Sequence, residues 1–178
     1  MPTDLYDPNC DGCKLSQGLK EPRGKVLIAM EGGWTLNHYG GSEGFLGWLA
    51  LQPRYHRMEI ADLTRSEAAA LGPNIQRIDA ALRQYWSISF SDDLIKRLYV
   101  LHFHEGPFDE KPSPYHLHLH LIPRTQKLRA LLRTGTDIIA YDIYKVSKAP
   151  TFPAEYKVDE PRAERLATFL KSALQSAS

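Results

Sequence analysis

The chain has 178 residues, of which 43% are hydrophobic and 24% charged, and its net charge is +1. This length and composition predict one globular domain with a substantial core, and the near-neutral charge argues against binding to long nucleic acid. The longest apolar runs fall well short of the roughly 20 residues that cross a bilayer, and the start of the chain is polar, so we expect neither a membrane helix nor a signal peptide.

The first motif along the chain is a pair of cysteines, Cys10 and Cys13, separated by two residues. The chain has no other cysteine, so no disulfide framework is expected and a reducing, cytoplasmic location is the simpler assignment. A pair at this spacing can supply half of a tetrahedral zinc site, with two further ligands from distant histidines. A thioredoxin-like redox motif would follow a strand, whereas Pro8 and Asn9 precede this pair.

Two apolar runs rich in strand-compatible residues follow, at 25–30 and 45–52, on either side of the glycines at 40 and 41. They predict two neighbouring strands. Thr64 begins a capping box, and apolar residues then recur at helical spacing, which predicts a helix over 65–85. Gly72 and Pro73 lie inside this helix, so we expect a kink or an interruption there.

The most informative stretch is 115–123, in which every second residue is a histidine: His116, His118 and His120. Successive side chains of a strand point to opposite faces, so the three imidazoles are expected on one face and the leucines on the other. Imidazole acts as base, nucleophile or metal ligand near neutral pH, so this row predicts a functional site rather than packing. Residues 97–104 also alternate and predict the antiparallel neighbour, and 105–114 predict a ligand-binding loop.

The chain ends with two predicted helices, at 126–133 and 161–174, and the second has an apolar stripe. Asp159 or Glu160 is expected to cap that last helix, and the proline-bearing residues 149–161 to connect to it. All these elements together predict an α+β domain around an antiparallel sheet.

Residues 116–122 match the signature His-φ-His-φ-His-φ-φ of the histidine triad (HIT) family at every position, where φ is apolar. Residues 53–64 and the helix after them also resemble the middle segment of that family. The resemblance implies a HIT-like antiparallel sheet with a long helix and a C-terminal helical extension. On this reading residues 1–125 form a HIT-like catalytic domain that includes the N-terminal zinc-binding segment, and 126–178 form an extension packed on the same domain.

The activity implied by the resemblance is that of a nucleotide hydrolase or nucleotidyl transferase. In the family the central histidine, here His118, attacks the α-phosphate of a nucleotide derivative and forms a covalent nucleotidyl-histidine, which water or another acceptor resolves. A neutral imidazole can attack through one nitrogen only if the other carries the proton, so a backbone carbonyl is expected to hold that N–H. His120 is suited to contact the phosphate oxygens.

The resemblance also suggests substrate-binding residues. Ser113 resembles the family's hydroxyl near the leaving oxygen, and Asn37 its ribose-contacting polar residue, although both residue types are also ordinary turn residues in such settings. His104 stands where the family usually has asparagine. His102 and His104 are therefore candidates for additional phosphate donors. Alternatively, His104 is only the polar end of its strand.

Some branches of the family, including bacterial members and the related hexose-phosphate uridylyltransferases, bind zinc through a cysteine pair, a mid-chain histidine and the first triad histidine. The corresponding residues here are Cys10, Cys13, His56 and His116. His56 has an alternative reading as a surface histidine. With four protein ligands the zinc site would be structural, because no position remains open for water.

Several functions stay open at this point. Hydrolysis of dinucleoside polyphosphates, nucleotidyl compounds or phosphoramidates is favoured, because uridylyltransferases carry glutamine where this chain has His120. The alternatives are a nucleotidyltransferase of the uridylyltransferase type, a zinc-water hydrolase that uses two triad histidines with His104, and a nucleotide-binding regulatory module with low turnover. The expected partner is a nucleotide-derived small molecule, and the resemblance suggests a homodimer.

Overall fold

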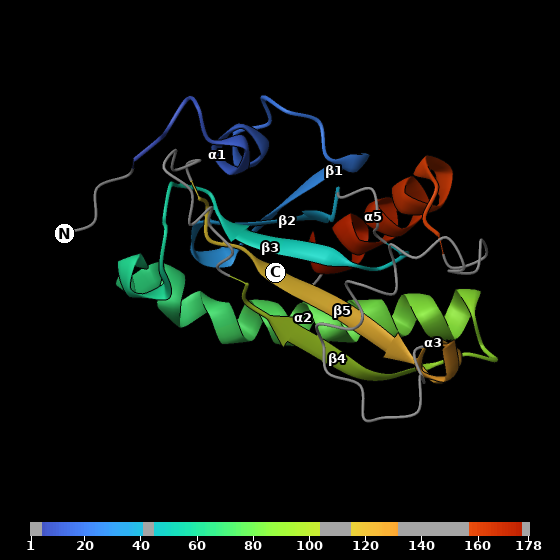
Figure 1. The fold of residues 1–178 in the computed structure, drawn as a ribbon. Coiled ribbons are helices and arrows are strands. Elements are labelled where there is room, and N and C mark those ends of the chain that lie inside the picture. The colour runs from blue at the N-terminus through green and yellow to red at the C-terminus, as the bar shows by residue number, and fades with distance from the viewer. Residues whose placement is uncertain (1–4, 41–44, 104–114, 132–156, 176–178) are drawn as a thin grey trace.

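The computed structural model describes residues 5–40, 45–103, 115–131 and 157–175, and shows one antiparallel sheet with helices packed against it (Figure 1). The strands lie in the order β1-β2-β3-β5-β4. Their bounds are β1 Arg23–Met30, β2 Trp34–His38, β3 Leu49–Pro53, β4 Ile95–Leu101 and β5 Leu119–Thr125. The helices are α1 Asp11–Ser16, α2 Arg65–Ser89, α3 Gln126–Leu131 and α5 Glu160–Gln175, with short 3-10 turns at Glu31–Gly33 and Ile60–Asp62. The predicted α+β class is confirmed.

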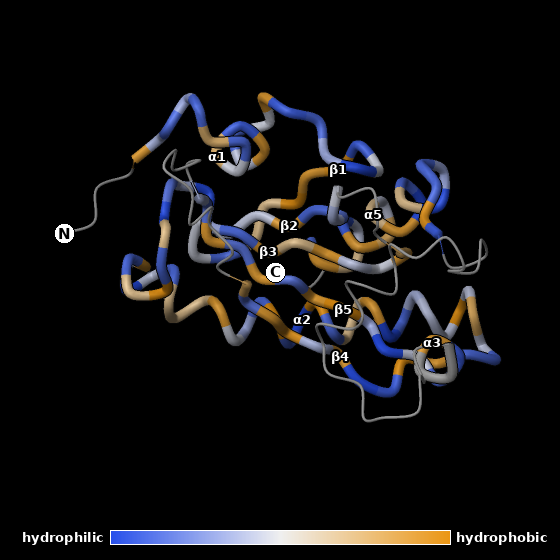
Figure 2. Tube along the Cα trace, in the orientation of Figure 1, coloured by the Kyte–Doolittle hydropathy of each residue, from blue (hydrophilic) through white to orange (hydrophobic). Residues whose placement is uncertain are grey.

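The long helices α2 and α5 cover one face of the sheet. Their apolar side chains form the main core with leucines that the strands direct to that face. Figure 2 shows hydrophobic residues along the strands and along both helices. The buried members include Leu36, Leu51, Leu119, Leu121, Ile78, Leu82, Leu166 and Leu170. The opposite face carries polar residues of the strands, and α1 packs beside it. The site described below lies on this polar face.

The two strands predicted at 25–30 and 45–52 are not neighbours, because β2 lies between them and pairs with both. Leu36 of β2 stands opposite Ile28 on one side and Leu51 on the other. The five residues of β2 are all buried, and the polar side chains of Thr35, Asn37 and His38 form hydrogen bonds within the protein. Leu49, rather than residue 45, begins β3, and Phe45 makes only an isolated bridge.

Helix α2 begins where the capping box predicts. The Thr64 hydroxyl accepts from the Glu67 N–H, and the Glu67 carboxylate accepts from the Thr64 N–H over 2.7 Å. The predicted interruption at Pro73 is wrong, because the helix continues through it to Ser89, four residues beyond the predicted end. Gly72 has no Cβ, which removes one of the clashes that a proline imposes, the clash with the residue before it.

The histidine stretch is only partly strand. β5 starts at Leu119, so His120 lies in the sheet whereas His116 and His118 belong to the extended segment just before it. In that segment the Leu117 N–H donates to the carbonyl of Arg57 over 2.7 Å. The predicted antiparallel pairing with β4 is confirmed, and Leu101 stands opposite His120.

The C-terminal helix α5 packs against β1 and α2. It starts at Glu160, and the Asp159 carboxylate caps it by accepting the Arg162 N–H over 2.8 Å, as one of the two predicted caps. Its predicted apolar stripe is buried at Leu166 and Leu170. Within the described ranges no helix combines the length and apolar character needed to span a bilayer.

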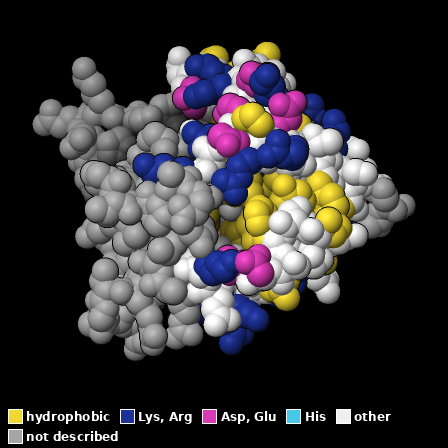
Figure 3. Space-filling model, turned by 90° about the vertical axis from the view of Figure 1, so that its right-hand side faces the viewer, with side chains coloured by type: hydrophobic (Ala, Val, Ile, Leu, Met, Phe, Trp, Pro, Cys, Tyr) yellow, Lys and Arg dark blue, Asp and Glu magenta, His cyan; other side chains and the backbone are white. Residues whose placement is uncertain are grey.

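A second, smaller apolar cluster consists of Phe45, Trp48, Ile122 and Leu128. Trp48 is fully buried there and stacks on Tyr39 with ring centroids 4.8 Å apart. Figure 3 shows apolar side chains gathered in one area of the molecular surface, between charged groups of both signs. The Trp48 indole is thus packed on several sides by apolar and aromatic side chains.

Candidate active site and metal centre

The structure brings the four predicted metal ligands together. Their ligand atoms all lie within 4.8 Å of one another, although three different segments supply them: Cys10, Cys13, His56 and His116. The Cys13 sulfur lies 3.3 Å from Nδ1 of His56 and 3.5 Å from Nδ1 of His116, and the Cys10 sulfur lies 3.6 Å from the latter. Tetrahedral zinc with sulfur and nitrogen ligands has edges of roughly 3.4–3.8 Å, so these three distances are close to those of such a site.

Proton positions in the cluster also suit a metal. Nε2 of His116 lies 2.8 Å from the carbonyl of Pro53, which can only accept, so Nε2 carries the proton and the Nδ1 lone pair faces the thiols. Burial lowers the pKa of His116 to about 4 and raises the pKa of the Cys13 thiol to about 11. A divalent cation would stabilise the neutral imidazole and displace the thiol protons.

Helix α1 is fitted closely to the first triad histidine. A Cβ on Gly12 would lie 2.4 Å from Cβ and Cγ of His116, so only glycine allows this approach. The Gln52 side chain donates to the Ser16 hydroxyl over 2.7 Å and to the Gly12 carbonyl over 3.1 Å. The described core clusters include no residue of α1, so α1 is held by polar contacts and the cysteine–histidine cluster.

The half-buried His118 is oriented by the backbone of the same segment. Its Nδ1 lies 2.8 Å from the carbonyl of His116, so Nδ1 carries the proton and Nε2 has a free lone pair. Burial lowers the pKa of His118, which keeps the ring neutral near pH 7. This is the arrangement expected of a nucleophilic histidine.

His120 has the opposite tautomer. The Trp48 indole N–H donates to Nδ1 of His120 over 2.9 Å, so the proton of the neutral ring sits on Nε2. Burial lowers the pKa of His120 to about 3, and the ring is therefore neutral. The rings of His118 and His120 lie edge to face with centroids 4.7 Å apart. The Nε2 of His118 thus has a lone pair, whereas the Nε2 of the neighbouring His120 ring is an N–H donor.

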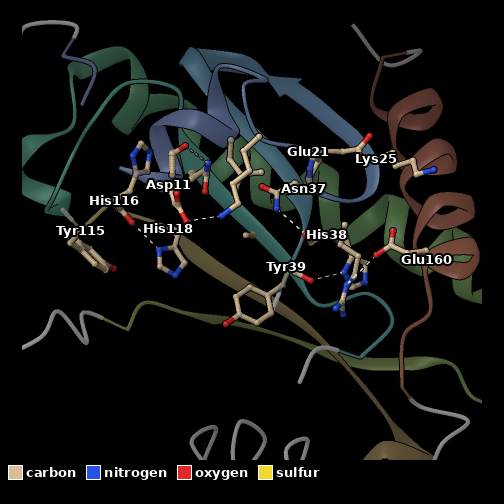
Figure 4. A pocket seen from close by; sticks show the side chains of 18 of the residues that line it. Asp11, Glu21, Lys25, Asn37, His38, Tyr39, Tyr115, His116, His118 and Glu160 are labelled. Carbon is tan, nitrogen blue, oxygen red and sulfur yellow. Dashed lines mark hydrogen bonds and ion pairs between the residues drawn. The ribbon is translucent and has the colours of Figure 1, made fainter. Parts of the chain in front are cut away.

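A cavity of about 1030 Å³ opens in front of His118 (Figure 4). One wall comes from α1 and the segment after it, and another from β2 and β3. Asn37 lines this cavity: its side-chain N–H₂ donates to the His38 carbonyl over 2.9 Å, while its buried Oδ1 has no hydrogen-bond partner. His120 is not among the residues that line it. The cavity offers the polar lining and the volume that a nucleotide would need.

The comparisons with solved structures find the same architecture. A Hit-like protein involved in cell-cycle regulation from Bartonella henselae matches with a TM-score of 0.54 and 15% identity, over 96% of this chain and 99% of that one. A Zn-bound histidine triad family protein from Mycobacterium smegmatis matches with a TM-score of 0.53 and 17% identity, over 94% of both chains. The chain has the histidine triad fold. No family model and no curated protein matches the sequence, so the likeness lies in the fold.

Two of the predicted substrate-binding residues cannot be placed in this histidine triad fold. Ser113 and His104 lie outside the described residues. His102 lies within them, and its Nε2 is 3.2 Å from the hydroxyl of Tyr115, which itself donates to the carbonyl of Phe103. His102 thus contacts a tyrosine next to the triad.

Sequence reasoning missed Trp48, the donor that sets the tautomer of His120 in the histidine triad fold. Trp48 stands in an apolar run, where a tryptophan is normally explained by packing alone. Its partner is 72 residues away, so no local spacing connects them. It also missed Lys20, which lines the cavity.

Proposed function

We propose that the protein is a member of the histidine triad family that hydrolyses nucleotide derivatives at the α-phosphate through a covalent intermediate on His118. The observation that carries this proposal is the complementary pair of tautomers. His118 has a free lone pair on Nε2 and His120 has a proton on Nε2, and the two rings lie edge to face. Nucleotidyl transfer needs such a nucleophile and such a donor together.

In the first step the Nε2 lone pair of His118 forms a bond to phosphorus, and the bond from phosphorus to the leaving group breaks. The proton stays on Nδ1 of His118 and is donated to the carbonyl of His116, so the developing positive charge on the ring is stabilised. The Nε2–H of His120 donates to a phosphate oxygen. In the second step water attacks phosphorus and releases a proton to the solvent, the bond to His118 breaks, and a nucleoside monophosphate leaves as the imidazole regains its lone pair.

The cluster of Cys10, Cys13, His56 and His116 is proposed to hold structural zinc. Zinc with four protein ligands anchors chain segments and leaves no open position for water. The same residue, His116, offers its ring to the metal and its carbonyl to His118. Zinc would therefore also fix the segment that orients the nucleophile.

The zinc-water alternative is less well supported by the geometry. It requires two triad histidines and His104 on one ion, but Nδ1 of His116 faces the thiols and Nδ1 of His120 accepts from Trp48. The proposed substrate contact of Asn37 fits better, because its buried Oδ1 can accept from a ribose hydroxyl. A nucleotide-derived small molecule thus remains the proposed partner, in a cytoplasmic protein that we also propose to be a homodimer.

A substrate panel tests the proposal. Dinucleoside polyphosphates, nucleotide sugars and nucleoside phosphoramidates, each with adenine, guanine or uracil, are incubated with the protein and the products are identified by mass spectrometry. We expect a nucleoside monophosphate as one product, and His118→Ala to lose at least about a thousandfold in kcat, as loss of a nucleophile does. Unchanged turnover in His118→Ala would contradict the mechanism. Tight nucleotide binding with negligible turnover across the panel would instead support the regulatory module.

A further inference from the structure

We infer that Lys20 is a phosphate-binding residue of this site, whose ammonium group meets the phosphate chain of the bound nucleotide. The inference rests on the proposed function and adds a residue from the N-terminal segment, outside the histidine stretch. Lys20 lines the same cavity as His118 and Asn37.

The chain just after α1 turns back so that Lys20 lies over the cavity. Gly18 has a positive φ of 73°, and the N–H groups of Leu19 and Lys20 both donate to the carbonyl of Lys14, over 2.8 and 3.2 Å. Together with the bond from the Gly18 N–H to the Leu15 carbonyl over 3.0 Å, the Leu19 bond is the pattern of a helix that ends at a glycine. The position of Lys20 is thus set by backbone structure, although its side chain is about half exposed.

Asp11 holds the ammonium group at the catalytic end of the cavity. Nζ of Lys20 lies 2.6 Å from Oδ2 of Asp11. Asp11 is next to Gly12, which packs on the ring of His116. Figure 4 shows Asp11 and His118 at one end of the cavity, and Lys25 and Glu160 at the other.

The other two basic residues that line the cavity are placed less well for the phosphate. Arg23 lies 3.7 Å from Glu160, and Lys25 lies at the same far end. Among the described residues that line the cavity, Lys20 is therefore the cation at the end that holds His118.

Positive charge is needed at that end. His120 accepts a hydrogen bond at Nδ1 and His118 must be neutral to attack, so neither ring brings a formal charge to the phosphates. Polyanionic phosphates are bound tightly where a cation replaces their hydration. Asp11 is 66% exposed, so its pairing with Lys20 is well solvated, and the ammonium group can turn to a phosphate at little cost.

Isothermal titration calorimetry tests this inference without turnover. Adenosine, AMP and ADP, and the corresponding guanine compounds, are titrated into the wild type, Lys20→Met and Lys20→Arg. Lys14→Met is the matched control, because Lys14 also pairs with Asp11, at 3.8 Å, but does not line the cavity. We expect Lys20→Met to bind ADP about tenfold more weakly. Binding of adenosine should stay within about twofold, Lys20→Arg should recover most of the loss, and Lys14→Met should match the wild type.

Equal affinities of Lys20→Met and wild type for ADP would overturn the role of Lys20 and leave the proposed function standing. Equal losses in Lys14→Met and Lys20→Met would also overturn it, because the effect would then be one of general surface charge. A wild type that binds none of the nucleotides would contradict both the role of Lys20 and the proposed function.

Discussion

The indole N–H of Trp48 donates to Nδ1 of His120 over 2.9 Å, and this bond decides which nitrogen of His120 carries the proton. Trp48 can act only as a donor, so it selects the tautomer with the proton on Nε2. The carbonyl of His116 selects the opposite tautomer of His118 in the same way. Two neighbouring histidines thus have different chemical roles because their Nδ1 atoms meet different partners.

Replacing Trp48 by phenylalanine removes the donor while keeping an apolar ring in the cluster. His120 can then adopt either tautomer, so we expect kcat to fall about tenfold, which corresponds to about 1.4 kcal/mol, with little change in KM. Steady-state kinetics on the best substrate of the panel measures this split. Nitrogen-15 NMR of labelled histidine should show one tautomer of His120 in the wild type and a mixture in Trp48→Phe.

Trp86→Phe is the control for this substitution. Trp86 is also buried, but it lies on α2 and packs against Tyr85 and Phe90, and no described hydrogen bond joins it to a triad histidine. We expect lower stability with unchanged kcat and unchanged histidine signals. The role assigned to Trp48 is wrong if both substitutions reduce kcat equally, or if His120 keeps its tautomer in Trp48→Phe.

Removal of zinc should loosen the N-terminal segment. At a free zinc concentration a thousand times its dissociation constant, binding stabilises the protein by about 4 kcal/mol. A chelator should therefore lower the melting temperature by roughly 8–16 °C. Elemental analysis should find one zinc per chain in the wild type and little in Cys13→Ala, whose melting temperature should no longer respond to the chelator. If the chelator does not change the melting temperature of the wild type, the proposed metal centre is contradicted.

Gly12→Ala tests how closely α1 fits the histidine segment. The new methyl group would lie 2.4 Å from the His116 side chain, and such overpacking costs about 1–3 kcal/mol. We expect lower stability and a lower zinc content. Gly40→Ala is the matched control, because an added Cβ there meets nothing within 4 Å. Equal behaviour of the two variants in denaturant titration would show that the close packing is not needed.

Buried histidines should make the fold sensitive to acid. Burial lowers the pKa of His38 to about 4 from its ordinary value of 6.5, and the ring donates to Tyr39 and accepts from Gly47 as a neutral group. The unfolded chain therefore binds more protons than the folded one between pH 6.5 and 4, so stability falls as the pH falls through this window. For His38 the loss amounts to about 3 kcal/mol.

Urea titrations from pH 7 to pH 4.5 measure this dependence. His38→Gln keeps an acceptor for Gly47 but cannot be protonated, so its stability should fall less steeply with acid. If the two slopes are equal, His38 is not a source of the acid sensitivity.

Local sequence signals predicted the parts of the fold that depend on local chemistry. The reciprocal cap of Thr64 and Glu67 fixed the start of α2, and the stripe of α5 was visible from Leu166 and Leu170. The burial of β2 could not be predicted from its residues, because its polar side chains are as buried as its apolar ones. Which strands are neighbours also depends on contacts that are distant in sequence.

The site, like the fold, could be predicted from the sequence only where local spacing defines it. The cysteine pair and the histidine repeat have recognisable spacings, and the structure brings Cys10, Cys13, His56 and His116 together as predicted. The tautomers depend on hydrogen bonds with Trp48 and with the carbonyls of Pro53 and His116. No side-chain motif in the sequence predicts these bonds. The sequence thus predicted which residues form the cysteine–histidine cluster. The hydrogen bonds indicate which nitrogen of each triad histidine carries the proton.

The most direct test of the account is to trap the nucleotidyl-enzyme. His120→Gln, which resembles the uridylyltransferases at this position, is mixed with the best substrate of the panel, quenched in seconds and analysed by intact-protein and tandem mass spectrometry. We expect one added nucleoside monophosphate group, located on His118 and absent from the double variant with His118→Ala. If the wild type turns the substrate over, two results for His120→Gln would contradict the central claim. One is no adduct on His118, and the other is an adduct on a different residue.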